Sequence, residues 1–334
     1  MIQVGLIGKG TIGGVHENAY RRLKKEGADV LLAACCDIRP EQMAAVDVDP
    51  SRKYTDLDEF LEMEKGKLDY VDICLPTYLH AEAAIKAMRA GFNVLSEKPM
   101  AISLELAREM VAVSEETGRK LMVAHCCRFG GAAPVLREII ASGEMGRIRS
   151  AEFFREGGGT GPMGYKNWFR DGKLSGGAML DLHIHDVDMI NWLFGRPKSV
   201  SAAAIQIITD GGYDAMSVNF EYDGFFVNAK SDWTIAHDKF NTRCIRANFE
   251  KGYVYCDNSP GRKTFVKVNL DGSVEDLSER RGDDMYYVEI CYYAKCLAAG
   301  VPVEDCMPAQ SAEAVEIVMA EMKSADHGGE RVAL

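Results

Sequence analysis

Apolar residues in the first part of the chain fall into short continuous runs, separated by stretches with helical periodicity. The apolar runs occupy residues 2–7, 30–36, 70–75, 92–96 and 120–125. The helical patterns occupy residues 11–26, 40–47, 56–64, 78–90 and 103–118. Near-continuous apolar strands that alternate with helices are typical of a parallel sheet covered on both faces. The pattern therefore predicts an α/β domain with a doubly wound parallel sheet over residues 1–125.

The pattern changes after this region. Beyond an expected helix at 132–142, strand-like runs follow one another at 147–156, 198–208, 215–222, 225–234, 243–249, 252–257 and 263–269. Turn sequences such as DGGYD and EYDGFF separate several of these runs, which indicates an antiparallel sheet. Helices are expected at 284–299 and 308–325, with a short strand in the final RVAL. We therefore expect an α+β domain over residues 126–334.

A glycine motif stands at the end of the first expected strand. Gly8, Gly10 and Gly13 have the spacing G-x-G-x-x-G and lead into the first expected helix. These glycines allow a tight turn, a close approach to a pyrophosphate and close packing of helix on strand. The helix N-terminus adds N–H donors for the phosphates, with Thr11 and Ile12 in the same turn. The motif predicts a Rossmann-type NAD(P)-binding domain.

An acidic residue closes the second expected strand. Asp37 stands where a carboxylate accepts hydrogen bonds from the adenosine ribose and repels a 2′-phosphate. This position favours NAD over NADP as the cofactor. Arg39 lies two residues further on and could pair with a phosphate instead, so NADP stays open as the alternative.

The sequence VLSEKPM, residues 94–100, ends the fifth expected strand. Ligands of open α/β sheets bind beyond the carboxyl ends of the strands, which places Glu97 and Lys98 at that edge. A lysine there could stabilise developing alkoxide charge on a substrate, although a solvated surface lysine is the alternative. The peptide bond between Lys98 and the following proline can be cis or trans.

The preceding strand ends in the same way, in CLPTYLH at residues 74–80. This segment reaches the same edge of the sheet and could pack against the nicotinamide or the substrate. We therefore include Pro76, Thr77 and His80 among the candidate cofactor contacts.

Five ionisable side chains interrupt the apolar stretch 176–195. They are Asp181, His183, His185, Asp186 and Asp188. A strand would place the first three on one face, as in a metal site. A helix would instead make Asp181 and His185 neighbours one turn apart, with Asp188 at nearly the same angle. The stretch is too long for an ordinary strand, so we predict one continuous helix.

The helical interpretation argues against a metal site, because few ligands remain on one side. Two interpretations stay open for Asp181 and His185: a structurally satisfied pair, or a catalytic pair. We favour the catalytic pair, because histidine titrates near neutrality and an adjacent carboxylate can orient it.

Charge and composition exclude several classes of protein. The formal net charge is −11 and the chain has no basic block, which argues against nucleic acid or an anionic membrane as a partner. No apolar run reaches the length of a membrane span, and the N-terminus does not resemble a signal peptide. Ten cysteines without C-x-x-C spacing suggest buried reduced thiols, and hence a cytoplasmic protein.

The order and spacing of three motifs resemble those of the Gfo/Idh/MocA oxidoreductases, over nearly the whole chain. The motifs are G-x-G-x-x-G, E-K-P, and G-G-x-x-x-D-x-x-x-H at residues 176–185. That family includes inositol dehydrogenases and glucose–fructose oxidoreductase. The resemblance implies a second domain built on a large, mostly antiparallel open sheet. It also implies a homodimer or homotetramer assembled through that sheet.

The resemblance further implies a catalytic set of Lys98, Asp181 and His185. The implied substrate is a polyol, an inositol, a sugar or a sugar derivative, lying between the nicotinamide and the helix at 176–195. His185 would take the hydroxyl proton while hydride leaves the same carbon for the nicotinamide. Lys98 and Asp181 would orient the hydroxyls and tune the proton transfer.

Three segments depart from the family pattern or extend the site. The family often has glycine where this chain has His183, whose role the sequence leaves unassigned. In HCCRF, residues 125–129, the neighbours are unusual but Arg128 is retained and could contact substrate or cofactor. Tyr165, Asn167 and Trp168 could form a sugar-binding wall, since amides bind hydroxyls and aromatic rings stack on sugars. Loop packing without a ligand is the alternative.

Two other functions fit the same motifs. One is a glycosidase that uses tightly held NAD for transient oxidation, and its mark is product formation without net NADH release. The other is a non-catalytic nucleotide-binding sensor, which would bind NAD without turning over any polyol.

Overall fold

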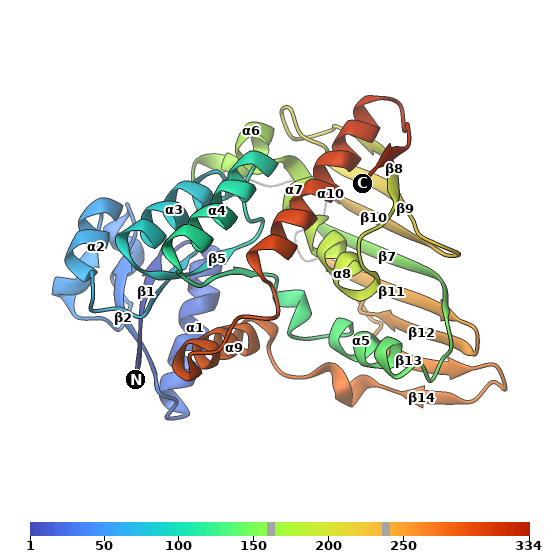
Figure 1. Ribbon diagram of the computed structural model, residues 1–334, viewed down its shortest axis with the longest axis horizontal. Coiled ribbons are helices and arrows are strands. Elements are labelled where there is room, and N and C mark those ends of the chain that lie inside the picture. The colour runs from blue at the N-terminus through green and yellow to red at the C-terminus, as the bar shows by residue number, and fades with distance from the viewer. Residues whose placement is uncertain (159–163, 236–240) are drawn as a thin grey trace. The chain divides into compact units, whose positions relative to one another are not determined.

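The computed structural model describes residues 1–158, 164–235 and 241–334 (Figure 1). The chain divides into two compact units. The first comprises Met1–Cys126 and Asp284–Glu313, and the second comprises Cys127–Asp283 and Ala314–Leu334. Residues 284–313 thus pack with the N-terminal part of the chain, although they follow the second sheet in sequence.

The first unit contains a sheet of six parallel strands. The strands are β1 (Ile2–Ile7), β2 (Val30–Cys36), β3 (Lys53–Tyr54), β4 (Tyr70–Ile73), β5 (Asn93–Glu97) and β6 (Leu121–Ala124). Their order in the sheet is β3-β2-β1-β4-β5-β6, the order of a doubly wound dinucleotide-binding fold. Every residue of β4 and of β6 is buried, as expected for a sheet covered on both faces. The predicted Rossmann fold is confirmed.

Helices connect these strands and cover the sheet. They are α1 (Thr11–Lys25), α2 (Leu57–Glu64), α3 (His80–Ala90), α4 (Leu104–Thr117) and α9 (Met285–Ala299). Helix α3 packs against α4, and α1 packs against α9 (Figure 1). Helices α3 and α4 end at Gly91 and Gly118, which adopt left-handed backbone conformations as C-terminal glycines commonly do.

One predicted helix of this unit is wrong. Residues 40–47 form only the short 3-10 turn η1 (Pro40–Met43). Within the segment only Met43 and Val46 are buried apolar side chains, so too little apolar surface is available to hold a longer helix on the sheet.

The second unit contains a sheet of nine strands. Its strands are β7 (Ile148–Gly158), β8 (Ser199–Ile205), β9 (Ala215–Glu221), β10 (Phe226–Ile235), β11 (Asn241–Phe249), β12 (Gly252–Asp257), β13 (Thr264–Asn269), β14 (Val274–Asp276) and β15 (Val332–Ala333). The order is β14-β13-β12-β11-β7-β10-β9-β8-β15. Strands β7 and β10 pair in parallel and the other recorded pairs are antiparallel. The predicted large, mostly antiparallel sheet is confirmed.

Side chains of this sheet alternate between two different environments. In β9, Met216, Val218 and Phe220 are buried, whereas the residues between them are exposed. The helices of the unit lie on one side of the sheet (Figure 1): α5 (Ala133–Ser142), α7 (Gly177–Asp181), α8 (Ile184–Phe194) and the later part of α10 (Pro308–Asp326). The opposite face of β9 presents the exposed residues, which are polar.

The stretch 176–195 is helical, but it is not the single helix that we predicted. Helix α7 ends at Asp181 and α8 begins at Ile184. At the break, the His183 backbone N–H donates to the carbonyl of Ala178, at 2.8 Å. That acceptor lies five residues back rather than four, so the turn is wider than an α-helical turn and interrupts the helix. Helix α8 stops before Gly195, as expected.

Two short strands, β3 and β14, were not predicted from the sequence. They contain two and three residues and form the ends of their sheets. No helix in the part of the chain that the structure describes is long and apolar enough to cross a membrane.

Candidate active-site residues in the two units

The G-x-G-x-x-G turn connects β1 to α1, with Thr11 and Ile12 at the start of the helix. A Cβ atom added to Gly13 would lie 2.0 Å from the carbonyl oxygen of Gly8, so only glycine fits there. A Cβ added to Gly10 would meet no protein atom within 4 Å. The first turn of α1 carries no acidic side chain. Open space beside uncapped N–H groups fits a pyrophosphate.

Asp37 follows β2 at the carboxyl edge of the sheet and is 7% exposed. Its carboxylate accepts the backbone N–H of Lys9 at 2.7 Å and that of Arg39 at 2.8 Å. The Arg39 Nε atom also lies 3.5 Å from the carboxylate. A carboxylate offers about four acceptor positions, so capacity remains for ribose hydroxyls. The group is held in place by the glycine-rich turn itself, and its geometry fits NAD.

The E-K-P segment has a tightly held backbone. Glu97 ends β5 and its Oε2 accepts the backbone N–H of Lys98 at 3.0 Å. The Lys98–Pro99 peptide bond is cis, and Lys98 is half-buried. The carbonyl of Pro99 lies 2.8 Å from His80 Nδ1, and the carbonyl of Leu75 lies 2.7 Å from His80 Nε2. His80 therefore joins the loops that follow β4 and β5.

The two ring nitrogens of His80 thus both face the protein's own backbone. Burial lowers the pKa of His80, and the hydrogen bonds to the Pro99 and Leu75 carbonyls oppose that shift. Among the other candidates after β4, Pro76 is half-buried and Thr77 is 2% exposed.

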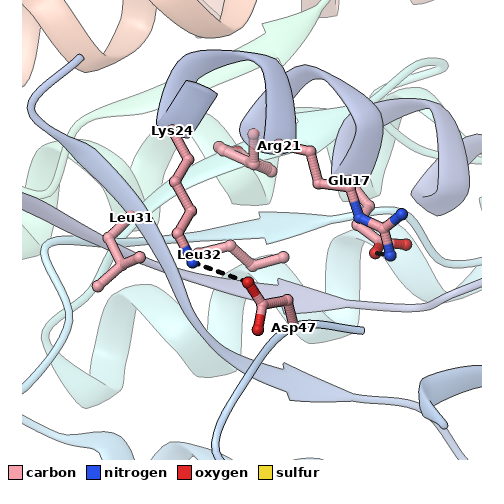
Figure 2. A pocket seen from close by; sticks show the side chains of 7 residues that line it. Glu17, Arg21, Lys24, Leu31, Leu32 and Asp47 are labelled. Atoms are coloured by element: carbon pink, nitrogen blue, oxygen red, sulfur yellow. Dashed lines mark hydrogen bonds and ion pairs between the residues drawn. The ribbon is translucent and has the colours of Figure 1, made fainter. Parts of the chain in front are cut away.

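A surface hollow of the first unit lies elsewhere. Figure 2 shows it between the later turns of α1, the start of β2 and Asp47. An ion pair of 2.7 Å between Lys24 and Asp47 crosses it. None of its lining residues is a candidate from the sequence: they are Glu17, Tyr20, Arg21, Lys24, Leu31, Leu32 and Asp47. The hollow is therefore separate from the predicted chemistry.

In the second unit, Asp181 and His185 differ from the polar residues around them. Asp181 is the last residue of α7 and His185 is the second residue of α8. Both are half-buried, whereas His183, Asp186 and Asp188 are buried. The Nδ1 atom of His185 lies 3.8 Å from the thiol sulfur of Cys127.

The other two acids of the stretch form buried ion pairs. Arg155 Nε and Nη2 donate to Asp186 at 3.0 and 2.7 Å. Arg128 Nε and Nη2 donate to Asp188 at 2.8 and 2.6 Å. Burial acts to lower the pKa of Arg155, but the charge of Asp186 and the hydrogen bonds to Asp186 and Cys127 together outweigh it, and the net pKa is raised. The sequence predicts Asp188 at nearly the same angle as Asp181 and His185; unlike those two residues, Asp188 is buried and paired with Arg128.

The pair with Asp188 also bears on Arg128 as a candidate substrate contact. The Arg128 side chain is 1% exposed, and its guanidinium carbon lies 5.6 Å from the centre of the Trp192 ring. Arg128 is thus part of the packing of α8. A substrate contact for it stays a prediction.

The structure places His183, which the sequence left unassigned, at the break between α7 and α8. Its Nδ1 lies 2.8 Å from the hydroxyl of Ser231 in β10, and its Nε2 lies 3.4 Å from Glu321 Oε2 in α10. His183 and Glu321 are fully buried, and burial raises the pKa of Glu321. His183 therefore connects the helix break to a strand and to α10.

The candidate sugar-binding wall lies in η5 (Tyr165–Arg170). Tyr165 is 44% exposed. Lys166 and Asn167 have left-handed backbone conformations, with φ of 55° and 58°. The half-buried ring of Trp168 stacks on Phe169, with ring centroids 3.9 Å apart. An exposed aromatic and an exposed amide are thus neighbours in this turn.

Sequence reasoning missed a buried polar cluster beneath the E-K-P segment. His16 in α1 and Asp72 in β4 are both fully buried and lie 2.9 Å apart. A signal was present, since Asp72 is the one charged residue inside the apolar run YVDICL. A buried acid requires a partner, although the sequence does not show which residue it is.

Two family models match most of the chain. Residues 2–125 match a model described as an oxidoreductase family with an NAD-binding Rossmann fold. Residues 135–255 match the GFO/IDH/MocA C-terminal domain.

Relatives and solved structures agree with these matches. The inositol 2-dehydrogenase of Rhizobium meliloti (strain 1021) is 31% identical over 65% of this chain and 64% of its own length. The trans-1,2-dihydrobenzene-1,2-diol dehydrogenase of Mus musculus is 25% identical over 96% of both chains. A levoglucosan dehydrogenase in complex with NADH and levoglucosan has the same fold, with a TM-score of 0.87, 20% identity, and coverage of 100% of this chain and 99% of that one. The chain spans 60–64% of the length of three curated relatives, including the first of these.

Proposed function

Because the chain belongs to the Gfo/Idh/MocA oxidoreductase family, we propose that it is an NAD(P)-dependent dehydrogenase. The proposed substrate is a polyol, an inositol, a sugar or a sugar derivative with a reactive secondary alcohol. The observation that carries the proposal is the exposure of Asp181 and His185. They remain half-buried in a segment whose other two acids, Asp186 and Asp188, are buried in ion pairs with arginines.

The roles of the catalytic residues follow from their chemistry. The bound nicotinamide supplies the hydride acceptor. His185 accepts the hydroxyl proton of the substrate, since imidazole exchanges a proton near neutral pH. The Lys98 ammonium group donates to the same oxygen and stabilises its developing negative charge. Asp181 accepts a substrate hydroxyl and keeps the alcohol oriented. In the reverse direction His185 returns the proton to the alkoxide.

The proposed cofactor is NAD rather than NADP. The Asp37 carboxylate is fixed by two backbone N–H groups and would repel a 2′-phosphate. Arg39 adds a positive charge. Its Nε lies 3.5 Å from the Asp37 carboxylate, which partly neutralises that charge. Relatives support the same assignment, since the family model that covers this unit is an NAD-binding one.

We further propose that the protein is a cytoplasmic homodimer or homotetramer. The face of the nine-stranded sheet opposite to the helices offers a surface for a second copy (Figure 1). Ten cysteines that are all free thiols fit a reducing compartment.

A substrate panel tests the proposed activity. Inositols, aldoses, amino sugars and sugar acids are incubated with the protein and NAD, then with NADP, and absorbance is followed at 340 nm. We expect NADH formation with at least one polyol or sugar, and slower turnover with NADP. Glycoside cleavage without net NADH would instead support the glycosidase. Nucleotide binding without turnover across the panel would support the sensor.

A further inference from the structure

A histidine of the nucleotide-binding helix lies within hydrogen-bond distance of two buried carboxylates. His16 belongs to the second turn of α1 and is fully buried. Its Nδ1 lies 2.9 Å from Asp72 Oδ2, and its Nε2 lies 3.1 Å from Glu97 Oε1. Carboxylates accept hydrogen bonds, so the ring satisfies both only when each nitrogen carries a proton. The geometry therefore requires an imidazolium.

The other groups around His16 agree with a positive charge. Burial acts to lower the pKa of His16, but the charge of Asp72 and the contacts with Asp72 and Cys74 together outweigh it, and the net pKa lies well above the usual value. The Tyr20 hydroxyl donates to Asp72 at 2.7 Å, and the Cys74 thiol lies 3.6 Å from the same carboxylate. Glu289 of α9 also has an oxygen within 4.8 Å of the His16 ring. His16 thus supplies a cation inside an acidic cluster.

The cluster extends directly to the backbone of Lys98. One oxygen of Glu97 faces His16 and the other accepts the Lys98 N–H, at 3.0 Å. Burial acts to raise the pKa of Glu97, but the hydrogen bond and charge of His16 and the charge of Lys98 together oppose it, and the net pKa is lowered. Glu97 therefore stays ionised, with both oxygens in use. A continuous chain of hydrogen bonds runs from α1 through Glu97 to Lys98.

We propose that His16 is a positioning residue, which fixes Lys98 for the reaction by holding Glu97 from the nucleotide-binding helix. The proposal rests on the catalytic role proposed for Lys98. His80 acts on the other side of the same lysine, where one ring nitrogen faces the carbonyl of Pro99. Lys98 is thus placed between two buried histidines, His16 acting through Glu97 before it and His80 acting through Pro99 after it.

Loss of the imidazolium has a specific consequence. Asp72 and Glu97 would face each other without an intervening cation, and like charges in a buried site repel. Glu97 would turn away or become protonated, and the Lys98 N–H would lose an acceptor. A displacement of about 1 Å at a catalytic group can reduce turnover by as much as ~100-fold.

The test compares His16→Gln with Tyr20→Phe in the full-length protein. Both substitutions remove one side chain's hydrogen bond to Asp72, but only the first also removes the contact with Glu97. We expect kcat to fall ~10–100-fold in His16→Gln, with a smaller change in KM, and less than ~3-fold in Tyr20→Phe. Glu97→Gln should lower kcat similarly, and the double variant should be no slower than the slower single variant.

A second readout does not depend on turnover. Reductive methylation with ¹³C-formaldehyde labels lysine amines, and comparison with Lys98→Met identifies the Lys98 signal. We expect His16→Gln to shift this signal and Tyr20→Phe to leave it in place. A folded His16→Gln variant with an unmoved Lys98 signal would overturn the positioning role, as would unchanged kcat. If the wild-type protein turns over no polyol but the signal still moves, the proposed function fails and the positioning role stands.

Discussion

Ion pairing separates the charged residues of the 176–195 stretch into two kinds. Asp186 and Asp188 are bound by buried arginines, and His183 contacts a buried glutamate, whereas Asp181 and His185 stay half-buried. The sequence could predict Asp181 and His185 because their motif is local. The partners could not be predicted, since they come from distant strands and helices whose packing no local pattern reveals.

The buried pair of Arg128 and Asp188 leads to a stability prediction. In Asp188→Asn the Arg128 guanidinium stays buried without its counter-charge, so we expect the free energy of unfolding to fall by ~3–5 kcal/mol. The control is Arg147→Ala, whose side chain is 89% exposed beside Glu250 and should contribute at most ~1 kcal/mol. Urea denaturation measures the free energy of unfolding of both variants. Equal losses in the two variants would contradict the assignment of Asp188 to the core.

The raised pKa of Glu321 predicts a pH dependence of stability. The folded protein holds this proton more tightly than the unfolded chain, because burial disfavours the carboxylate. The stabilisation is complete below the unfolded pKa of about 4.3 and is lost as pH rises through the folded pKa. Urea unfolding between pH 4 and 8 should therefore show Glu321→Gln gaining stability relative to wild type as pH rises. A pH-independent difference would mean that Glu321 titrates as in the unfolded chain.

At the scale of elements, the glycines of the strand–turn–helix unit at the N-terminus have different roles. Gly13 is required by the fold, because a side chain there would strike the Gly8 carbonyl. Gly10 has open space where a side chain would point, so its task concerns the ligand. The motif predicted the turn from sequence, but only coordinates separate the two tasks.

Alanine substitutions at these glycines have distinct expected outcomes. Gly10→Ala should keep the free energy of unfolding within ~0.5 kcal/mol of wild type and weaken NADH binding, since the new methyl group occupies pyrophosphate space. Gly13→Ala should lower stability as well as binding. Gly14→Ala is the control, because its Cβ would meet only the flexible end of Lys9, at 3.3 Å. Fluorescence titration measures the affinity for NADH, and urea denaturation measures the free energy of unfolding. Normal NADH affinity in Gly10→Ala would contradict the phosphate site.

The helix break at residues 182–183 shows a limit of periodicity. The apolar positions predicted a helix throughout the stretch, and the stretch is indeed helical. The hydrogen bond from His183 to Ala178 skips one residue and divides the helix. Because a single wider turn changes no residue type, the pattern of apolar positions could not show it.

At the scale of the whole molecule, alternation of strand and helix predicted the first sheet, and consecutive strand-like runs separated by turns predicted the second. Strands β1, β2 and β12 have the bounds expected from sequence. Strands β3 and β14 were missed because two or three residues are too few to show a period. The pattern of apolar runs could not predict the strand order of the second sheet, because β7 pairs in parallel with β10, which follows it after a long connection.

The proposed oligomer predicts a change in mass. Phe154 lies between the buried residues Phe153 and Arg155 of β7, and therefore points to the face of the sheet opposite to theirs. Light scattering should give the mass of two or four chains for the wild type, and of one chain for Phe154→Glu, because a buried charge opposes association. Met63→Glu, at an exposed position of α2, should keep the wild-type mass. A monomeric wild type would contradict assembly.

The central proposal is that Lys98 and His185 are catalytic residues of the hydride-transfer reaction. The most direct test measures NADH formation at 340 nm with the best substrate of the panel, for Lys98→Met, His185→Ala and the exposed control Lys65→Met. We expect kcat/KM to fall ~100-fold or more in the first two variants and to stay near wild type in the third, while NADH still binds all three. Turnover at the wild-type rate in Lys98→Met or in His185→Ala would contradict the claim.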